Sequence, residues 1–336
     1  MNCNYCERRC FISEGATGFC RMYTADKNGI RELYTNRWSA FGTSRIESIP
    51  FYHAYPGSRS LVIGTSGCNF SCKYCSNAFI AKEDPAKVQD IMTELLPEEI
   101  LNMAKKLGCD NIVFNVNEPA VSLPTLVNLG EAACKAGFPM GCLTNGYTTE
   151  ESTEMLASTF SFFNIGLKGL SAVFHKEYIG IPSVWPVLRN IRKLAATSHV
   201  EIITPVIQSV NDHELDRIAD FIAETDPEIP WHVFRLLPEH LMKDEQYPSI
   251  EAINCALESA RKKLCYVYFH NFVGSDWVDT TCPVCGAKVI ERFSLGCGGD
   301  TLRRMLLEEG RCPGCGKNIR ILSNNGCEQE IKEESA

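Results

Sequence analysis

Two alternating hydrophobic patterns between about residue 60 and residue 275 constrain the fold of this chain more than any other feature. Short β-branched or apolar runs alternate there with longer amphipathic stretches of helical period. Most of the short runs are too hydrophobic for a half-exposed sheet, which indicates parallel strands buried on both faces. The expected strands lie at 60–66, 111–116, 141–145, 162–168, 200–207 and 231–238, with 266–271 as a candidate seventh.

Six or so consecutive βα units predict an α/β fold, a partial or complete (β/α) barrel of about six parallel strands. A doubly wound sheet is the alternative. In a barrel, the reactive residues lie where the carboxyl ends of the strands meet the following loops. Asn211 and Ser249 are expected N-caps of two helices. The expected helices cover 97–108, 123–137, 150–159, 187–197, 211–225 and 249–264.

The βα pattern is confined to the middle of the chain, which divides it into a Cys-rich cap at 1–59, the barrel at 60–275 and a Cys-rich segment at 276–336 with a polar tail. Both flanking segments are rich in Gly and Cys and carry little apolar surface. Bound metal would compensate for the small core of such segments.

Eighteen cysteines occur in the chain, many in tight C-x2-C and C-x3-C groups. No hydrophobic signal segment opens the sequence and no apolar run reaches the roughly 18 residues of a membrane span. We therefore expect a cytoplasmic protein with no membrane partner, whose grouped cysteines bind metal rather than form disulfides. The formal net charge of −8 argues against nonspecific electrostatic binding to nucleic acid.

Three cysteines, Cys68, Cys72 and Cys75, follow the first expected strand directly, so their thiolates converge at the barrel mouth. A closed zinc or iron site takes four protein ligands, whereas three thiolates on a four-iron cubane leave one iron open to another ligand. The alternatives are a zinc site with a distant fourth ligand, or three free cysteines in a loop.

The C-x3-C-x2-C spacing, with the aromatic Tyr74 just before the third cysteine, resembles the radical S-adenosylmethionine (SAM) superfamily. The resemblance implies a 4Fe-4S cluster whose open iron chelates SAM. One-electron reduction, by reduced ferredoxin or flavodoxin, then cleaves SAM to methionine and a 5'-deoxyadenosyl radical that abstracts hydrogen. It also implies that Tyr74 touches the adenine, and the cluster makes us expect sensitivity to oxygen.

Polar residues at the later strand ends match further segments of the superfamily. Asn117 and Glu118 would hold the SAM ammonium, and a carboxylate suits that cation. The other matches approach the methionine or the ribose, although a turn at 144–146, a solvated lysine and a packed core histidine are the alternatives for them. These matches are Thr144, Asn145, Lys168 and His232.

Several nearby residues receive a structural interpretation or none. Gly166 stands where the family usually carries an Asp, which puts an acidic contact there in doubt. Glu201 is explained by its strand, and His53 by packing. Arg235 should point away from the face of His232 if the strand is regular, so no role is assigned to it.

Two further cysteine groups flank the barrel. At the C-terminus, two C-P-x-C-G knuckles predict a tetrahedral four-thiolate site of the zinc-ribbon kind, with iron in the same cage as the alternative. The N-terminal C-x2-C-x3-C-x9-C group suits zinc or a second iron-sulfur cluster, and spacing does not separate them. Cys297 and Cys327 fall outside both groups, which comprise Cys282, Cys285, Cys312 and Cys315, and Cys3, Cys6, Cys10 and Cys20.

The order of these motifs resembles the AmmeMemoRadiSam-system radical SAM proteins, relatives of the pyruvate formate-lyase-activating enzymes. That resemblance implies an enzyme that forms a carbon radical on a small molecule or a protein. A glycyl-radical-enzyme activase and transfer of an aminocarboxypropyl group are variants of this chemistry, while about 60 residues before the barrel leave no room for a cobalamin domain. From another class, a noncatalytic iron-sulfur or zinc scaffold would not bind SAM.

Overall fold

A single eight-stranded sheet organises the computed structural model, which describes residues 1–323. Its strand order is β12-β11-β10-β9-β8-β7-β5-β4, and every neighbouring pair is parallel except β4 with β5. The strands are β4 (Ala40–Arg45), β5 (Arg59–Gly64), β7 (Asn111–Phe114), β8 (Met140–Thr144), β9 (Phe162–Gly166), β10 (His199–Val206), β11 (Trp231–Arg235) and β12 (Val267–His270).

The parallel strands follow one another in chain order, so the sheet has no switch point of the doubly wound kind. Its two edge strands, β12 and β4, do not pair with each other, which makes the structure a partial barrel. The sequence predicted this α/β fold, and the candidate seventh strand at 266–271 is present as β12.

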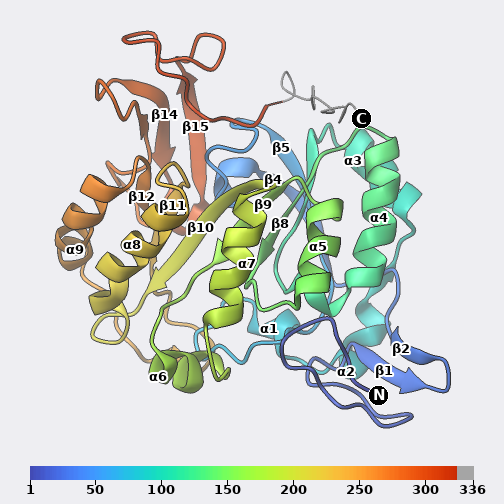
Figure 1. The fold of residues 1–336 in the computed structure, drawn as a ribbon. Coiled ribbons are helices and arrows are strands. Elements are labelled where there is room, and N and C mark those ends of the chain that lie inside the picture. Colours follow the sequence, from blue (N-terminus) through green and yellow to red (C-terminus); the bar gives the residue numbers. More distant parts are fainter. Residues whose placement is uncertain (324–336) are drawn as a thin grey trace, which may run out of the picture.

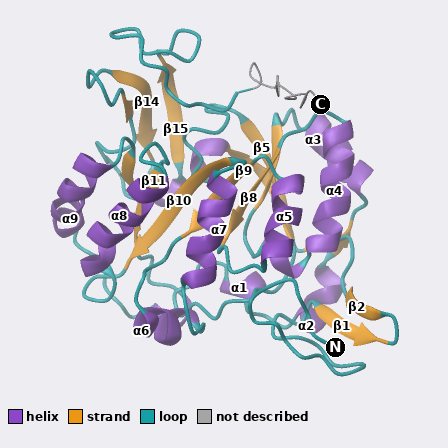
Figure 2. Cartoon of the chain, viewed as in Figure 1, coloured by secondary structure: helices purple, strands orange, loops and turns teal. Residues whose placement is uncertain are grey.

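Helices cover the outer face of the sheet, as Figures 1 and 2 show. Their apolar sides pack against outward-facing strand residues such as Ile112, Ile202 and Val233, and these contacts form the largest hydrophobic core. The covering helices are α3 (Pro97–Lys106), α4 (Leu123–Lys135), α5 (Glu150–Thr159), α7 (Trp185–Ala195), α8 (Leu215–Thr225) and α9 (Ile250–Lys263).

Of the two residues expected to be N-caps, one caps its helix and the other does not. Ser249 caps α9, because its hydroxyl accepts from the backbone N–H of Ala252 at 3.2 Å. Asn211 precedes a 3-10 turn but does not cap it. Its side chain instead accepts from the Ile207 N–H and donates to the Lys168 carbonyl, so it joins the loops after β10 and β9.

The inner face of the sheet is filled at its amino end by the segment between β4 and β5. Ile46, Ile49 and Phe51 pack there against Val113 and Phe162, which point inward from β7 and β9. The chain after β12 closes the same end with a three-stranded antiparallel sheet and its following loops. That sheet consists of β13 (Thr280–Thr281), β14 (Lys288–Ser294) and β15 (Asp300–Met305).

The N-terminal segment lies at the opposite end. In Figure 1, the hairpin of β1 (Tyr23–Asp26) and β2 (Gly29–Glu32) lies at the bottom, near the short helices α1 (Ala78–Ala81) and α2 (Pro85–Val88), whereas β14 and β15 lie at the top. The two Cys-rich segments therefore cover different ends of the barrel. Besides short 3-10 and π turns, the described chain contains the short elements β3 (Arg37–Trp38), β6 (Thr93–Glu94) and α6 (Ala172–Phe174).

Within residues 1–323, no helix is long and apolar enough to cross a membrane. Cys327 and the polar tail lie outside the described residues.

Candidate active site

A cavity of about 320 Å³ opens at the carboxyl ends of the parallel strands. Its walls come from the loops after β5, β7, β8 and β9 and from the ends of β10 and β11. The three cysteines of the triad line it together with six of the seven residues expected to contact SAM, which are Tyr74, Asn117, Glu118, Thr144, Asn145 and Lys168. The triad and these six residues, which are spread over 100 positions of the sequence, thus converge on one site.

The triad loop begins where β5 ends. Burial raises the pKa of the Cys68 thiol to about 12 and that of Cys72 above its usual value, while Lys82 opposes the shift at both and Lys168 opposes it at Cys72. The Phe70 N–H lies 3.4 Å from the Cys68 sulfur and points to it. Such buried thiols stay protonated until a metal displaces the proton, and N–H donors and cations then stabilise the bound thiolates.

Asn117 fixes the geometry of the triad loop. Its amide donates to the Thr65 hydroxyl at 2.9 Å and to the Ser66 and Gly67 carbonyls, and its oxygen accepts from the Thr65 N–H at 3.0 Å. Because these bonds use both ends of the amide, Asn117 positions the residues just before Cys68. Whether it also touches SAM stays a prediction.

The residue before Asn117 is strained. Val116 adopts φ 79°, a backbone region that β-branched residues rarely enter. The turn brings the Asn115 carbonyl so close to Gly64 that a Cβ on this glycine would lie 2.7 Å from it. The strained turn therefore holds the loops after β5 and β7 together at the cavity.

Glu118 presents a buried carboxylate to the cavity. It accepts from the Thr144 hydroxyl at 2.8 Å and from the Asn145 N–H at 2.8 Å. Burial raises its pKa to about 7, although these bonds and Lys168 oppose the shift. Without a further cation this carboxylate is only marginally ionised at neutral pH, so the site favours a positively charged ligand group.

Lys168 follows β9 and borders the same cavity. A side chain on Gly166 would meet its amino group, because a Cβ built there lies 3.1 Å from the Lys168 Nζ. The glycine that replaces the family's Asp thus leaves room for the lysine. Lys168 is half-buried, and its charge acts on the Glu118 carboxylate across the cavity, although it forms no direct ion pair among residues 1–323.

Three buried polar atoms on cavity residues have no hydrogen-bond partner within residues 1–323: Tyr74 Oη, Asn164 Oδ1 and Arg235 Nε. Native proteins leave few such atoms unpaired, and a bound ligand, ion or water is one explanation for those that occur. Together with three thiols of the required spacing, they fit a 4Fe-4S cluster and a polar cofactor such as SAM.

His232 does not line the cavity. It is fully buried one layer deeper in the barrel, where its Nε2 lies 2.6 Å from Glu201 Oε2 and its Nδ1 lies 3.1 Å from His270 Nε2. His270 in turn contacts Asp300 on β15 at 2.6 Å. His232 therefore belongs to a buried network, and a direct contact with SAM stays a prediction.

Glu201 is the centre of this network. The backbone N–H groups of Tyr52, His53 and Ala54 donate to its carboxylate at 2.9, 2.9 and 3.1 Å, and His199 lies 3.0 Å from it. Burial alone would raise its pKa, but the hydrogen bonds of His199 and His232 hold the pKa well below its usual range. The sequence interpretation, which assigned Glu201 only to its strand, missed this function as an anchor.

Sequence reasoning also missed Arg235, which borders the cavity at the end of β11. Strand alternation placed it on the far side from His232, but the strand ends at this residue. Its guanidinium packs near the rings of Tyr247 and Phe272, 5.1 and 5.4 Å from their centroids. In the described part of the chain it forms no ion pair, so it offers a free cation to a ligand.

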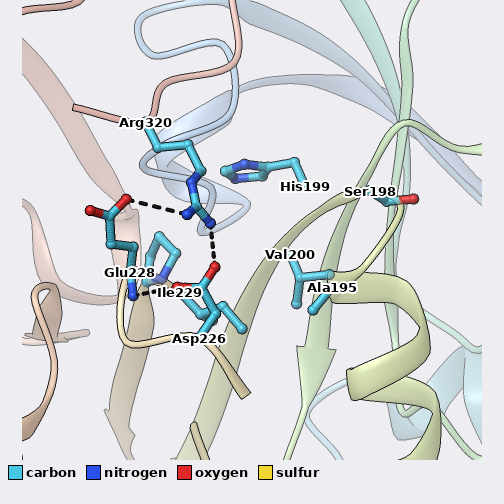
Figure 3. Close-up of a pocket in the computed structure, with 9 residues that line it drawn as sticks. Ala195, Ser198, His199, Val200, Asp226, Glu228, Ile229 and Arg320 are labelled. Atoms are coloured by element: carbon cyan, nitrogen blue, oxygen red, sulfur yellow. Dashed lines mark hydrogen bonds and ion pairs between the residues drawn. The ribbon is translucent and has the colours of Figure 1, made fainter. Parts of the chain in front are cut away.

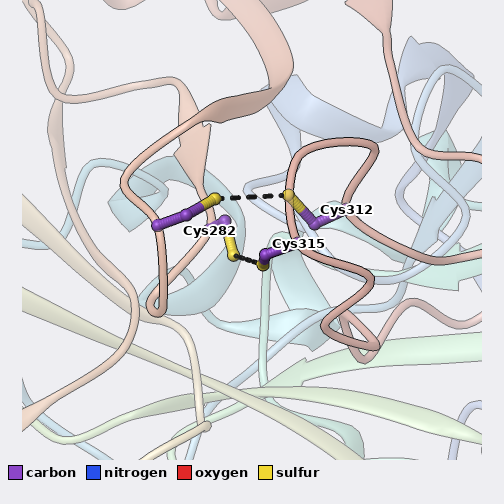
Figure 4. A group of neighbouring side chains, drawn as sticks. Cys282, Cys312 and Cys315 are labelled. Atoms are coloured by element: carbon purple, nitrogen blue, oxygen red, sulfur yellow. Dashed lines mark hydrogen bonds between the residues drawn. The ribbon is translucent and has the colours of Figure 1, made fainter.

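The four knuckle cysteines form a compact group. Cys282 and Cys315 have sulfurs 3.5 Å apart, Cys285 and Cys312 have sulfurs 3.6 Å apart, and all four lie within 4.8 Å of one another (Figure 4). A tetrahedral ion with bonds of about 2.3 Å needs sulfurs about 3.8 Å apart. The group therefore fits one metal ion, as the spacing of the knuckles predicted.

The four N-terminal cysteines line one small cavity, about 10 Å³ in volume, between the N-terminal segment and the triad loop. Burial raises the pKa of Cys6 to about 11 and of Cys20 to about 12, and the charges of the other cysteines contribute to both shifts. These cysteines are therefore near neighbours.

A different small cavity, about 40 Å³, lies at the amino ends of β10 and β11 (Figure 3). Arg320 lies there between Asp226 and Glu228, 3.3 Å from the latter, so its charge is already neutralised. Because the cation that lines this cavity is already paired with two carboxylates, we assign it no ligand.

Comparison with known proteins agrees with this geometry. The model of the radical SAM superfamily matches residues 62–222. The chain is 30% identical over 334 residues to the uncharacterized protein MJ0808 of Methanocaldococcus jannaschii, and the match covers 96% of both proteins. This chain belongs to the radical SAM superfamily and is an enzyme of that superfamily.

Solved structures align with parts of this chain. SuiB of Streptococcus suis bound to S-adenosylmethionine aligns with a TM-score of 0.49 and 15% identity over 64% of this chain and 51% of SuiB. A domain of the pyruvate-formate lyase-activating enzyme of Bacteroides vulgatus aligns with a TM-score of 0.41 and 22% identity over 47% and 98%.

Proposed function

We propose that this enzyme reductively cleaves SAM at a 4Fe-4S cluster held by Cys68, Cys72 and Cys75, and abstracts hydrogen from a substrate in the adjoining cavity. The observation that carries the proposal is the convergence of the triad and six polar or aromatic residues on one cavity at the carboxyl ends of the strands. Superfamily membership supports SAM-dependent radical chemistry in general. The bound cluster would supply the electron that cleaves the sulfonium to methionine and a 5'-deoxyadenosyl radical.

The chain's own residues bind and orient the cofactor. The Glu118 carboxylate, fixed by Thr144 and the Asn145 N–H, would accept the SAM ammonium. Lys168 or Arg235 would hold the carboxylate. Tyr74, whose hydroxyl has no partner in residues 1–323, would border the adenine.

Several apolar side chains also line the cavity, which suits a site that must exclude water from a reactive radical. They include Leu143, Ile203, Pro205 and Phe234. The substrate, whether a small molecule or a protein segment, would enter here. None of these residues favours a glycyl-radical-enzyme activase over other radical SAM enzymes.

The remaining proposals concern the C-terminal metal site, the electron donor and the conditions in which the enzyme works. The C-terminal four-cysteine group would hold structural zinc, because its sulfurs have the separation of a single tetrahedral ion. The reductant would be reduced ferredoxin or flavodoxin, since radical SAM enzymes need a one-electron donor. We also propose a cytoplasmic location and oxygen sensitivity for the enzyme.

Anaerobic reconstitution with iron and sulfide, followed by SAM and dithionite, tests the proposal. Wild-type protein should release 5'-deoxyadenosine, as measured by liquid chromatography and mass spectrometry. The Cys72→Ala variant should release none, and Cys134→Ala, on the exposed side of α4, should match the wild type. Absence of SAM cleavage by a fully reconstituted wild-type cluster would favour the noncatalytic scaffold.

A further inference from the structure

The N-terminal cysteine site has features of a metal site: four cysteines share one cavity, and a backbone donor is directed to one of their sulfurs. The Phe19 N–H points to the Cys10 sulfur at 3.5 Å. Cys3, Cys6 and Cys20 line the same small cavity as Cys10. Such donors to cysteine sulfur stabilise bound thiolates in metal and iron-sulfur sites.

The spacing of the sulfurs separates this site from the knuckle site. Among the described residues, only the four knuckle cysteines form a group of three or more ligands within 4.8 Å of one another. The N-terminal cysteines are more widely spaced, although they share one cavity, and so are the cysteines of the triad. A cubane binds each thiolate on a different iron atom and therefore needs wider spacing than one zinc ion does.

The N-terminal site also adjoins the triad directly. Gly67, just before Cys68, packs so closely on Cys20 that a Cβ on the glycine would lie 2.7 Å from the Cys20 carbonyl oxygen. Asn69, just after Cys68, lines the N-terminal cavity, and its carbonyl accepts a hydrogen bond from the Arg8 guanidinium. Both chain neighbours of Cys68 therefore contact the N-terminal segment.

We propose that Cys3, Cys6, Cys10 and Cys20 hold a second iron-sulfur cluster of the four-iron type, at the back of the triad loop. It would accept one electron from an external low-potential electron-transfer protein and pass it to the triad cluster. The site does not depend on the proposed function, whereas its relay role does. The zinc ion that the sequence left as the alternative would be redox-inert and would not serve this role.

Metal and sulfide analysis of the full-length protein, reconstituted anaerobically, tests the site. The wild type should bind about eight iron atoms per chain, and the Cys68→Ser/Cys72→Ser/Cys75→Ser variant should keep about four. In the triple variant, Mössbauer spectra should show a four-iron cluster, and dithionite should reduce it to a paramagnetic state. The control variant Cys134→Ser should bind as much iron as the wild type.

The triple variant alone decides the outcome, because it leaves the N-terminal ligands intact. Fewer than about three iron atoms in the folded triple variant, with or without a second zinc ion, would overturn the proposal. About four iron atoms in both the wild type and the triple variant would support the N-terminal cluster but refute the triad cluster. A Cys6→Ser/Cys20→Ser variant should lose about four iron atoms. Its remaining triad cluster should be reduced more slowly by reduced flavodoxin than by dithionite.

Discussion

Glu201 allows a quantitative test of how the barrel is closed. Its Oε2 accepts from the Tyr52 N–H and contacts His232, while its Oε1 accepts from the His53 and Ala54 N–H groups and contacts His199. The Glu201→Gln substitution keeps the shape but replaces one oxygen with an N–H2 group. At Oε1 that donor faces the N–H groups of His53 and Ala54, and at Oε2 it faces the Tyr52 N–H, so either orientation loses at least one backbone hydrogen bond.

The expected loss follows from that count. A hydrogen bond to a charged group contributes about 1.5–3 kcal/mol, so the loss of one or two such bonds predicts a decrease of about 1.5–6 kcal/mol in the free energy of unfolding. That decrease is a large fraction of the roughly 5–15 kcal/mol that stabilises a typical domain. The exposed pair of Glu154 with Lys193, 2.6 Å apart, provides the control, and Glu154→Gln should cost less than about 1 kcal/mol.

Urea unfolding under anaerobic conditions, followed by circular dichroism and tryptophan fluorescence, measures both variants at matched metal content. Because the pKa of Glu201 lies well below its usual range, the difference should persist from pH 8 to pH 5.5. A loss below about 1 kcal/mol with an unchanged m-value would refute the network as the closure of the barrel.

Three further predictions concern the two ends of the barrel. Burial raises the pKa of Glu118 to about 7, so its charge destabilises the folded state as pH rises through 7. Relative to wild type, Glu118→Gln should gain about 2 kcal/mol of stability between pH 5 and pH 8 in urea titrations without SAM, yet bind SAM roughly tenfold more weakly by calorimetry at pH 8. Cys312→Ser should lose one metal ion by mass spectrometry and expose 276–323 to protease, whereas intact resistance would mean that the metal is dispensable there. Gly67→Ala should destabilise more than Gly137→Ala, because both have positive φ but only Gly67 packs on Cys20; equal unfolding midpoints would contradict this contact.

The sequence predicted the strands because each one is a short apolar run between helical stretches. It also predicted that Glu118, Thr144 and Lys168 would lie near the triad, since the ends of successive parallel strands meet at one edge. The cavity confirms this proximity. The bound groups themselves stay proposals.

Other features could not be read from local pattern. Alternation along β11 gives the face on which His232 lies, but its depth depends on Glu201 and His270, which lie on other strands. Arg235 reaches the cavity because β11 ends at that residue. Asn211 bonds to the loops after β9 and β10 rather than to the turn it precedes, a choice set by tertiary contacts.

The positions of the N-terminal and C-terminal Cys-rich segments indicate that they have different functions. The C-terminal segment lies at the amino end of the barrel, where Lys317 pairs with Glu228 just before β11, and Leu322 pairs with the segment at Ala54. Metal bound there can stabilise the closure but lies at the end opposite the cavity. The N-terminal segment contacts both chain neighbours of Cys68, so a change at its cysteines would directly affect the conformation of the triad loop. Ligand spacing and location therefore agree. The closely spaced knuckle cysteines lie in the segment that closes the amino end of the barrel, and the more widely spaced N-terminal cysteines lie beside the triad, which must receive an electron.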